Sequence, residues 1–141
     1  MGEMIFNSAQ VMAFVRHLFV HAGWSMRDAD IAAQHLVLAD QSGHPSHGVG
    51  MVPRYVEAMD AGHLKPDNHV TETLRSGNFL VVQGNTALGQ VAAHDVTRSG
   101  IALAQAHGIA LVNLINAHHI GRIGHYAEMA AAEGLIGLFW V

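Results

Sequence analysis

The chain has 141 residues, of which 50% are hydrophobic and 13% are charged, and its formal net charge is −4. This length fits one domain of about 100–150 residues with a single core. The seven Lys and Arg residues are scattered, which excludes the basic surface that nucleic acid requires, and the absence of cysteine excludes disulfides and thiolate metal sites.

No apolar run approaches the ~18 residues of a membrane span, and the first ten residues lack the pattern of a secretion signal. We therefore expect a soluble, cytoplasmic protein with no membrane partner. The low charged fraction indicates that much of the surface is covered by a partner subunit or by further chain. A homo-oligomer, most simply a dimer, is expected.

Two helices are expected at the start of the chain. Ser8 would cap the first, whose apolar residues recur at three- and four-residue spacing, and Gly23 would end it. Ser25 and Asp28 resemble a capping box, which would open a second helix that runs to about Ala39.

A polar loop and a third helix follow. Residues 40–48 are dense in turn formers, so this segment is expected to be a loop. The third helix would run over about 49–61, with Pro53 in its first turn and Gly62 after its end. His47 would then lie just before a helix N-terminus.

Beyond residue 66 the hydrophobic pattern changes to short β-type runs and then alternates between helix and strand. A hairpin is expected first, followed by a long alanine-rich helix that ends near residue 107. A buried strand, a polar loop, a further helix and a last strand are then expected in that order. The expected ranges are 69–74 and 79–83 for the hairpin, 109–115 for the next strand, 116–124 for the loop, 126–133 for the helix and 135–141 for the last strand.

These elements predict an α/β fold that begins with a helical segment and continues as a mixed β/α layer. We divide it into residues 1–66, the helical segment with the Ser46-His47-Gly48 loop, and residues 67–141, an incomplete α/β part. Because the sequence stops inside the final expected strand, we expect a truncated chain.

The unusual polar residues are concentrated in two loops. Ser46 and His47 precede the third expected helix, and His118 and His119 follow a buried-type strand. A histidine side chain titrates near pH 6.5, so it can act as acid or base near neutrality. His47 and His119 are therefore candidate acid–base groups, whereas structural or surface roles are expected for His17, His21, His35, His63, His69, His94 and His107.

The sequence also allows a metal site or a phosphate-binding loop. His44 and His47 could join His118, His119 and His125 in a nitrogen-rich metal site, although Pro45 interrupts the first pair and no acidic ligand accompanies them. The spacing Gly84-x₄-Gly89 suggests a phosphate loop, but no Lys follows it. The glycine signature of the common Rossmann fold is absent from the sequence.

The order of several motifs resembles the type-2 malate/L-lactate dehydrogenases, the group that includes hydroxycarboxylate and ureidoglycolate dehydrogenases and diketogulonate reductase. The resemblance spans essentially the whole chain. It is carried by Asp40 and Gly43 before Ser46-His47-Gly48-Val49, by Pro53, Tyr55 and Gly62, by Gly89-Gln90, by Gly108-Ile109-Ala110, by Asn116-x-x-His119-x-Gly121-x-x-Gly124-x-Tyr126, and by Gly134-Leu135-Ile136-Gly137-Leu138.

This resemblance implies a non-Rossmann dehydrogenase fold, of which the chain is the N-terminal portion, and hydride transfer between NAD or NADP and a 2-oxoacid or 2-hydroxyacid. It implies that His119, or else His47, moves the proton, and that Ser46 contacts the substrate. Tyr55 would line the pocket. Many relatives carry an Arg where this chain has Met51, so Arg54 is the candidate for the substrate carboxylate.

The resemblance places most of the nicotinamide-binding segment after Val141, so the cofactor-binding residues are unassigned and no metal is expected. Two alternatives stay open at this point. The chain could be a catalytically inactive fold or interaction module, or it could be the His-rich metal-binding module described above.

Overall fold

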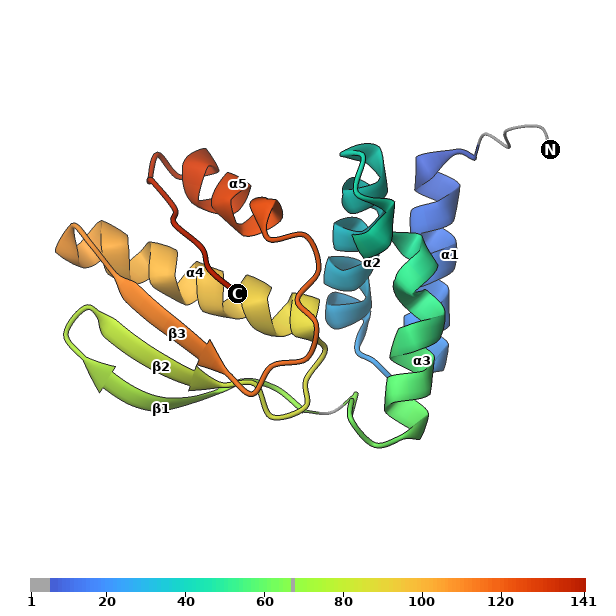
Figure 1. Cartoon of the computed structure of the whole chain (residues 1–141), viewed down its shortest axis with the longest axis horizontal. Helices are drawn as coiled ribbons and strands as arrows, with labels where there is room; N and C mark the ends of the chain where they lie inside the picture. The colour runs from blue at the N-terminus through green and yellow to red at the C-terminus, as the bar shows by residue number, and fades with distance from the viewer. Residues whose placement is uncertain (1–5, 67) are drawn as a thin grey trace.

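The computed structural model describes residues 6–66 and 68–141, and in it a helical part lies beside an α/β part (Figure 1). This arrangement confirms the expected α/β class with an N-terminal helical segment. Asp67, at the expected boundary between the two parts, lies outside the described residues. The elements are α1 (Ser8–His21), α2 (Met26–Gln41), the 3₁₀ turns Pro45–His47 and Val49–Met51, α3 (Val52–Asp60), β1 (Thr71–Ser76), β2 (Phe79–Gln83), α4 (Gly89–His107), β3 (Leu111–Ile115) and α5 (Gly124–Ala132).

The first two helices begin at side-chain caps. The cap of α1 is Asn7 and not Ser8, because the Asn7 side-chain oxygen accepts hydrogen bonds from the backbone N–H groups two and three residues ahead, at 3.0 and 3.2 Å. Asparagine and serine are equally good caps, so the sequence alone does not separate adjacent candidates. The expected cap of α2 is confirmed, since Ser25 Oγ accepts from the Asp28 N–H at 3.1 Å.

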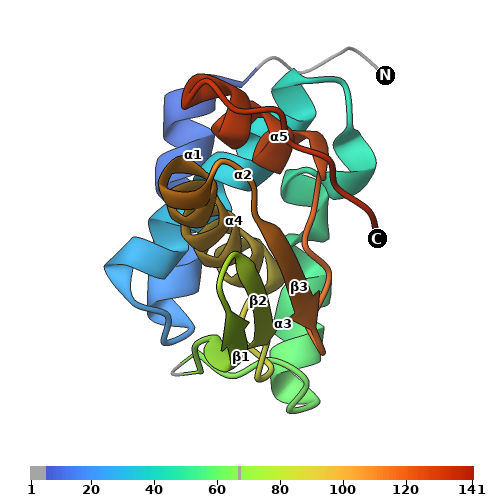
Figure 2. The same cartoon turned by 90° about the vertical axis from the view of Figure 1, so that its left-hand side faces the viewer.

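The sheet contains three strands in the order β1-β2-β3, with β1 antiparallel and β3 parallel to β2. The expected hairpin and the following strand are confirmed, although β1 and β3 each begin two residues later than expected. Helix α4 forms the crossover and packs along one face of the sheet (Figures 1 and 2), where Leu80 and Val82 of β2 form a core cluster with Val96 and Leu103.

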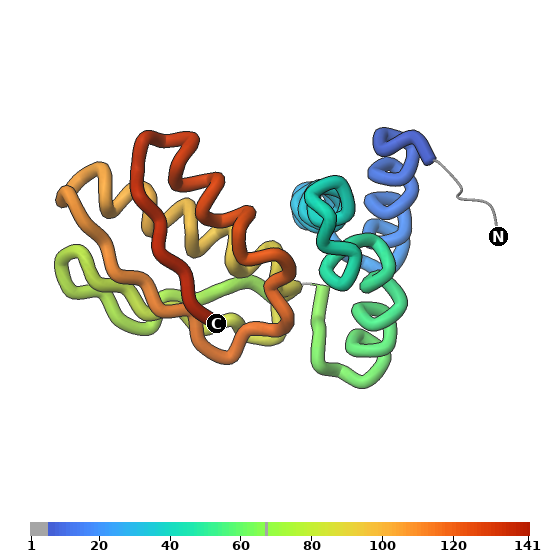
Figure 3. The backbone as a smooth tube through the Cα atoms, turned by 45° about the horizontal axis from the view of Figure 1, so that its top comes forward, coloured from blue at the N-terminus to red at the C-terminus, as the bar shows by residue number. Residues whose placement is uncertain are grey.

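The expected strand over 135–141 is not formed. The segment runs past β3 in the same direction (Figure 3), but among the described residues no backbone hydrogen bond joins it to the sheet. Its anchors are on α5 instead: the Leu135 N–H donates to Ala130 at 3.0 Å, and the Phe139 ring lies 6.2 Å from the Tyr126 ring. Apolar strand-like residues therefore end up exposed, with Ile136 at 94% and Trp140 at 78%.

Helix α4 belongs to both hydrophobic cores. Its first turn, with Leu88 and Val91, lies in the core of the helical part together with Phe19 and Tyr55, while its later turns cover the sheet. The burial of apolar surface on both sides fixes the two parts to one another through this helix.

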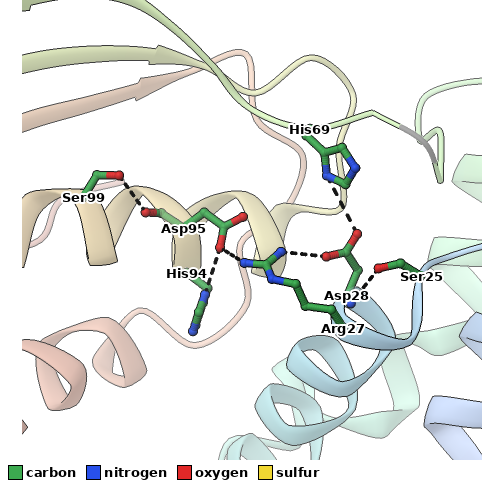
Figure 4. A network of polar contacts seen from close by, with 7 residues as sticks. All are labelled: Ser25, Arg27, Asp28, His69, His94, Asp95 and Ser99. Carbon is green, nitrogen blue, oxygen red and sulfur yellow. Dashed lines mark hydrogen bonds and ion pairs between the residues drawn. The ribbon is translucent and has the colours of Figure 1, made fainter.

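A polar network reinforces this junction (Figure 4). Arg27 on α2 donates to Asp28 on the same helix, at 2.8 Å, and to Asp95 on α4. Asp28 is 2% exposed and lies in the first turn of α2, where a negative charge is favoured by the helix dipole. Asp28 therefore combines a helix-end interaction with an ion pair to Arg27, the residue that bridges α2 and α4.

We predict that Asp28→Ala lowers the free energy of unfolding by about 1–2 kcal/mol, because it removes a buried charge-assisted hydrogen bond and a favourable helix-end charge. Urea denaturation would measure the change. The control is Asp30→Ala, which breaks an exposed ion pair with Arg16 on α1 and should cost no more than about 0.5 kcal/mol. Equal losses in the two variants would contradict the role assigned to Asp28.

Candidate active site

The two histidines singled out in the sequence meet at the junction of the two parts. His47 comes from the connection between α2 and α3, and His119 comes from the loop between β3 and α5. Their rings stack with centroids 5.3 Å apart and planes inclined by 23°. The fold thus joins two loops that are far apart in the sequence.

The loop that carries His47 is held by Asp40 near the end of α2. The Asp40 carboxylate accepts a hydrogen bond from the Val49 N–H at 2.9 Å, directly over Gly48. A Cβ on Gly48 would lie 1.8 Å from an Asp40 oxygen, so only glycine fits here. Ser46 is exposed, and its Oγ lies 2.9 Å from His47 Nδ1, which leaves Nε2 of His47 for other contacts.

The loop that carries His119 is held from below by His35. His35 is 2% exposed, and its Nε2 accepts a hydrogen bond from the Arg122 N–H at 2.8 Å. Gly121, at φ +79°, passes so close that a Cβ there would lie 2.3 Å from the same nitrogen. Although the sequence placed His35 among structural or surface histidines, this buried contact makes it a direct support of the site.

His119 is the first member of a chain of hydrogen bonds that leads into the protein interior. Its Nδ1 lies 3.1 Å from the Tyr55 hydroxyl, which also contacts the Gln90 side-chain amide. Tyr55 was expected to line the pocket, but its side chain is 0% exposed and lies behind His119. Sequence analysis named Gln90 only within the Gly89-Gln90 motif of the resemblance and gave it no role, although it is a polar residue at the start of an alanine-rich helix.

Burial is the main cause that lowers the pKa of His119 below its ordinary value of 6.5, and the charges of His47, His118 and Arg54 lower it further. Burial also lowers the pKa of neighbouring His118, with a smaller effect from His63. At neutral pH the protein therefore presents neutral imidazoles at this site.

An open cleft of about 440 Å³ lies in front of His119. Arg54 and Met51 both line it, so the guanidinium expected to replace the missing Arg at position 51 shares a cleft with the candidate acid–base group. The lining residues are Met51, Arg54, Glu57, Ala58, Ala61, His63, His118 and His119.

The histidines considered for a metal site do not form one in the described part of the chain. No group of three or more His, Asp or Glu side chains there is arranged to hold a metal ion. His125 packs against His35, with centroids 4.8 Å apart, and His44 Nδ1 lies 2.8 Å from the Ser42 carbonyl oxygen. Nor is any described helix long and apolar enough to cross a membrane.

Comparisons with known proteins agree on one family. The family model for malate/L-lactate dehydrogenase matches residues 6–141. The chain is 40% identical over 136 residues to hydroxycarboxylate dehydrogenase B of Escherichia coli strain K12, and the alignment covers 96% of the chain and 38% of the relative. It is 38% identical over 108 residues to the L-lactate dehydrogenase of Cupriavidus necator, which covers 77% of the chain and 31% of that relative.

Solved structures show the same fold. The malate dehydrogenase of Pyrococcus horikoshii OT3 superposes with a TM-score of 0.90 at 30% identity, over 93% of this chain and 38% of that one. The chain thus spans 31–38% of the length of these three proteins.

We predict that stability falls with acid because His35 must stay neutral in the folded state. Burial first, and then the charges of His125 and Arg122, lower the pKa of His35 from 6.5 to about 3. The folded state therefore resists protonation, and the stability present above pH 6.5 should be lost as the pH falls toward 3, by up to about 1.4 kcal/mol per pH unit.

Urea denaturation as a function of pH would test this. His35→Gln keeps an acceptor for the Arg122 N–H but does not titrate, so its stability should depend less steeply on pH. His17→Gln, at an exposed position on α1, should follow the wild-type slope. If His35→Gln retains the full slope, another group is responsible.

We also predict that His47→Gln raises the pKa of His119, because it removes a neighbouring ring whose positive charge opposes protonation of His119. NMR titration of the His119 ring protons would measure the change. His107→Gln, at the exposed end of α4, should leave the titration unchanged. A His119 pKa that is unchanged or lower in His47→Gln would argue against electrostatic coupling of the stacked rings.

Proposed function

This chain belongs to the malate/L-lactate dehydrogenase family, and we propose that it supplies the proton-transfer and substrate-binding groups of a dehydrogenase for 2-oxoacids and 2-hydroxyacids of the malate/lactate type. The observation that supports this most directly is His119. It lies between an open cleft and a buried hydrogen-bonded tyrosine, and it stacks on the second loop histidine.

In this proposal His119 exchanges a proton with the oxygen on C2 of the substrate, as acid in reduction and as base in oxidation. Its Nδ1 is held by Tyr55, so Nε2 is the nitrogen left for the cleft. His47 lies beside the same substrate oxygen, and Ser46 hydrogen-bonds either the substrate or His47. Tyr55 acts through His119.

Arg54 binds the substrate carboxylate in this proposal. Its charge is among the causes that lower the pKa of His119, so an anion bound to Arg54 would offset that effect. Substrate binding would then favour the protonated, proton-donating form of His119. The cleft would couple recognition of a carboxylate to the supply of a proton.

A nicotinamide dinucleotide, NAD or NADP, is the proposed carrier of the hydride that C2 gains or loses. The N-terminus of α4 is not available to its phosphates. A Cβ on Gly89 would lie 2.2 and 2.5 Å from the backbone oxygens of His119 and His118, so backbone carbonyls cover the N-terminus of α4.

The two parts would contribute different residues to the site. Residues 1–66 carry Ser46, His47 and Arg54. Residues 67–141, which we assign as the start of the α/β nicotinamide-binding part, carry His119. We propose cytoplasmic location and a homodimer, in keeping with the low charged fraction and the exposed apolar end of the chain.

We predict that, in the holoenzyme, His119→Ala lowers kcat about 10²–10⁴-fold and removes the ionisation near neutrality from the pH profile of kcat/KM. His47→Ala should mainly raise KM and keep that ionisation. Oxidation of NADH or NADPH that depends on a 2-oxoacid would be followed.

His17→Ala, on the exposed face of α1, is the control and should leave turnover unchanged. If His47→Ala rather than His119→Ala removes the ionisation, the two roles are exchanged. Wild-type rates and profiles in both variants would refute the site.

A further inference from the structure

Gln90 is a buried amide behind the proposed acid–base group. It occupies the second position of α4 and is 0% exposed. Its side-chain nitrogen donates to the Tyr55 hydroxyl, which in turn lies 3.1 Å from Nδ1 of His119. The three side chains come from α4, α3 and the loop before α5, so the chain of hydrogen bonds crosses the junction of the two parts.

Packing alone does not account for an amide at this position. The neighbouring residues Leu88, Val91 and Ala92 are buried and apolar, and the Gln90 side-chain oxygen has no hydrogen-bond partner among the described residues. A buried polar atom without a partner costs stability, and a methionine of similar volume would avoid that cost. The amide therefore needs an explanation outside the core.

The direction of the hydrogen bonds explains why an amide is present at position 90. A phenol has one hydrogen to donate, and its oxygen can accept. When the Gln90 N–H donates to the Tyr55 oxygen, the Tyr55 hydrogen is free to donate to Nδ1 of His119. A neutral imidazole that accepts at Nδ1 must carry its own hydrogen at Nε2.

We propose that Gln90 is a positioning residue that sets, through Tyr55, which nitrogen of His119 carries the proton. This inference rests on the proposed role of His119. A ketone oxygen only accepts hydrogen bonds, so an Nε2–H facing the cleft matches a 2-oxoacid. A hydroxyl that must give up its proton needs a bare Nε2, which requires the hydrogen at Nδ1.

An amide is suited to both cases because it presents a donor and an acceptor at the same reach. If Gln90 turns its oxygen toward Tyr55, the Tyr55 hydrogen points to Gln90 and the Tyr55 oxygen accepts from Nδ1–H of His119. Rotation of one buried amide thus exchanges a neutral ring that can only hydrogen-bond the 2-oxoacid for a ring whose bare Nε2 can take the hydroxyl proton of the 2-hydroxyacid. That transfer gives the imidazolium, with its Nδ1–H still donated to Tyr55, and the same imidazolium returns the proton to a 2-oxoacid in the reverse reaction.

The test is ¹⁵N NMR of the imidazole rings in the 141-residue chain, which reports the tautomer without any turnover. The wild-type His119 is expected with its hydrogen at Nε2. Gln90→Glu, measured at a pH where its carboxyl is ionised, presents only acceptors to Tyr55, so it should invert the preference and place the hydrogen at Nδ1. Thr97→Val, at another buried polar position two turns along α4, should change nothing.

Gln90→Met keeps the volume and removes the polar group, which guards against a failure of the glutamate variant to fold. In it the His119 nitrogen shifts should move toward those of exposed His17, because the bias on Tyr55 is gone. The inference is overturned if His119 keeps its wild-type shifts in both variants, or if wild-type His119 already has the shifts of His17. Loss of activity in His119→Ala would still support the proposed function in that event, so the two failures are distinguishable.

Discussion

The site depends on the close approach of two backbone segments, the start of α4 and the loop that carries His119. Gly89 opens α4 against the carbonyls of His118 and His119, and Gly121 passes directly over the ring of His35. Neither position has room for a side chain, and the Arg122 N–H closes the contact on His35. Because the loop rests on buried groups from α2 and α4, His119 meets His47 in one defined geometry.

The electrostatics of the site follow from this burial. The neighbouring imidazoles of His47 and His118 oppose a positive charge on His119, and burial is the main cause that lowers the pKa of its ring. The cation in the same cleft adds to this effect. In the proposed function, an anionic substrate bound to Arg54 would add an opposite charge to this cleft, whose lining also includes Glu57. Such an effect would not depend on which 2-oxoacid carries the carboxylate.

The sequence carried those features that have a local cause. Helix periodicity and the Ser25 cap predicted α1 and α2, and the glycines and histidines of the two loops pointed to the residues that meet. The features that were missed depend on tertiary contacts. His35 looks like any helical histidine until the loop from the other part is placed on it, and Gln90 has a role only beside Tyr55. The final segment, although it has the composition of a strand, packs on α5, and β3 is an edge strand of the sheet that the described residues form.

The stack of His47 on His119 has a consequence for how the site responds to motion. One ring belongs to the helical part and the other to the α/β part, and α4 contributes to the core of each. Any rotation between the parts would have to disrupt the packing of the first turn of α4, where Leu88 and Val91 contact the helical core and Gln90 contacts Tyr55. The same turn that joins the two cores also carries the hydrogen bond that orients the proton of His119. A change in the packing of this turn would therefore act on the proposed chemistry through the contact between Gln90 and Tyr55.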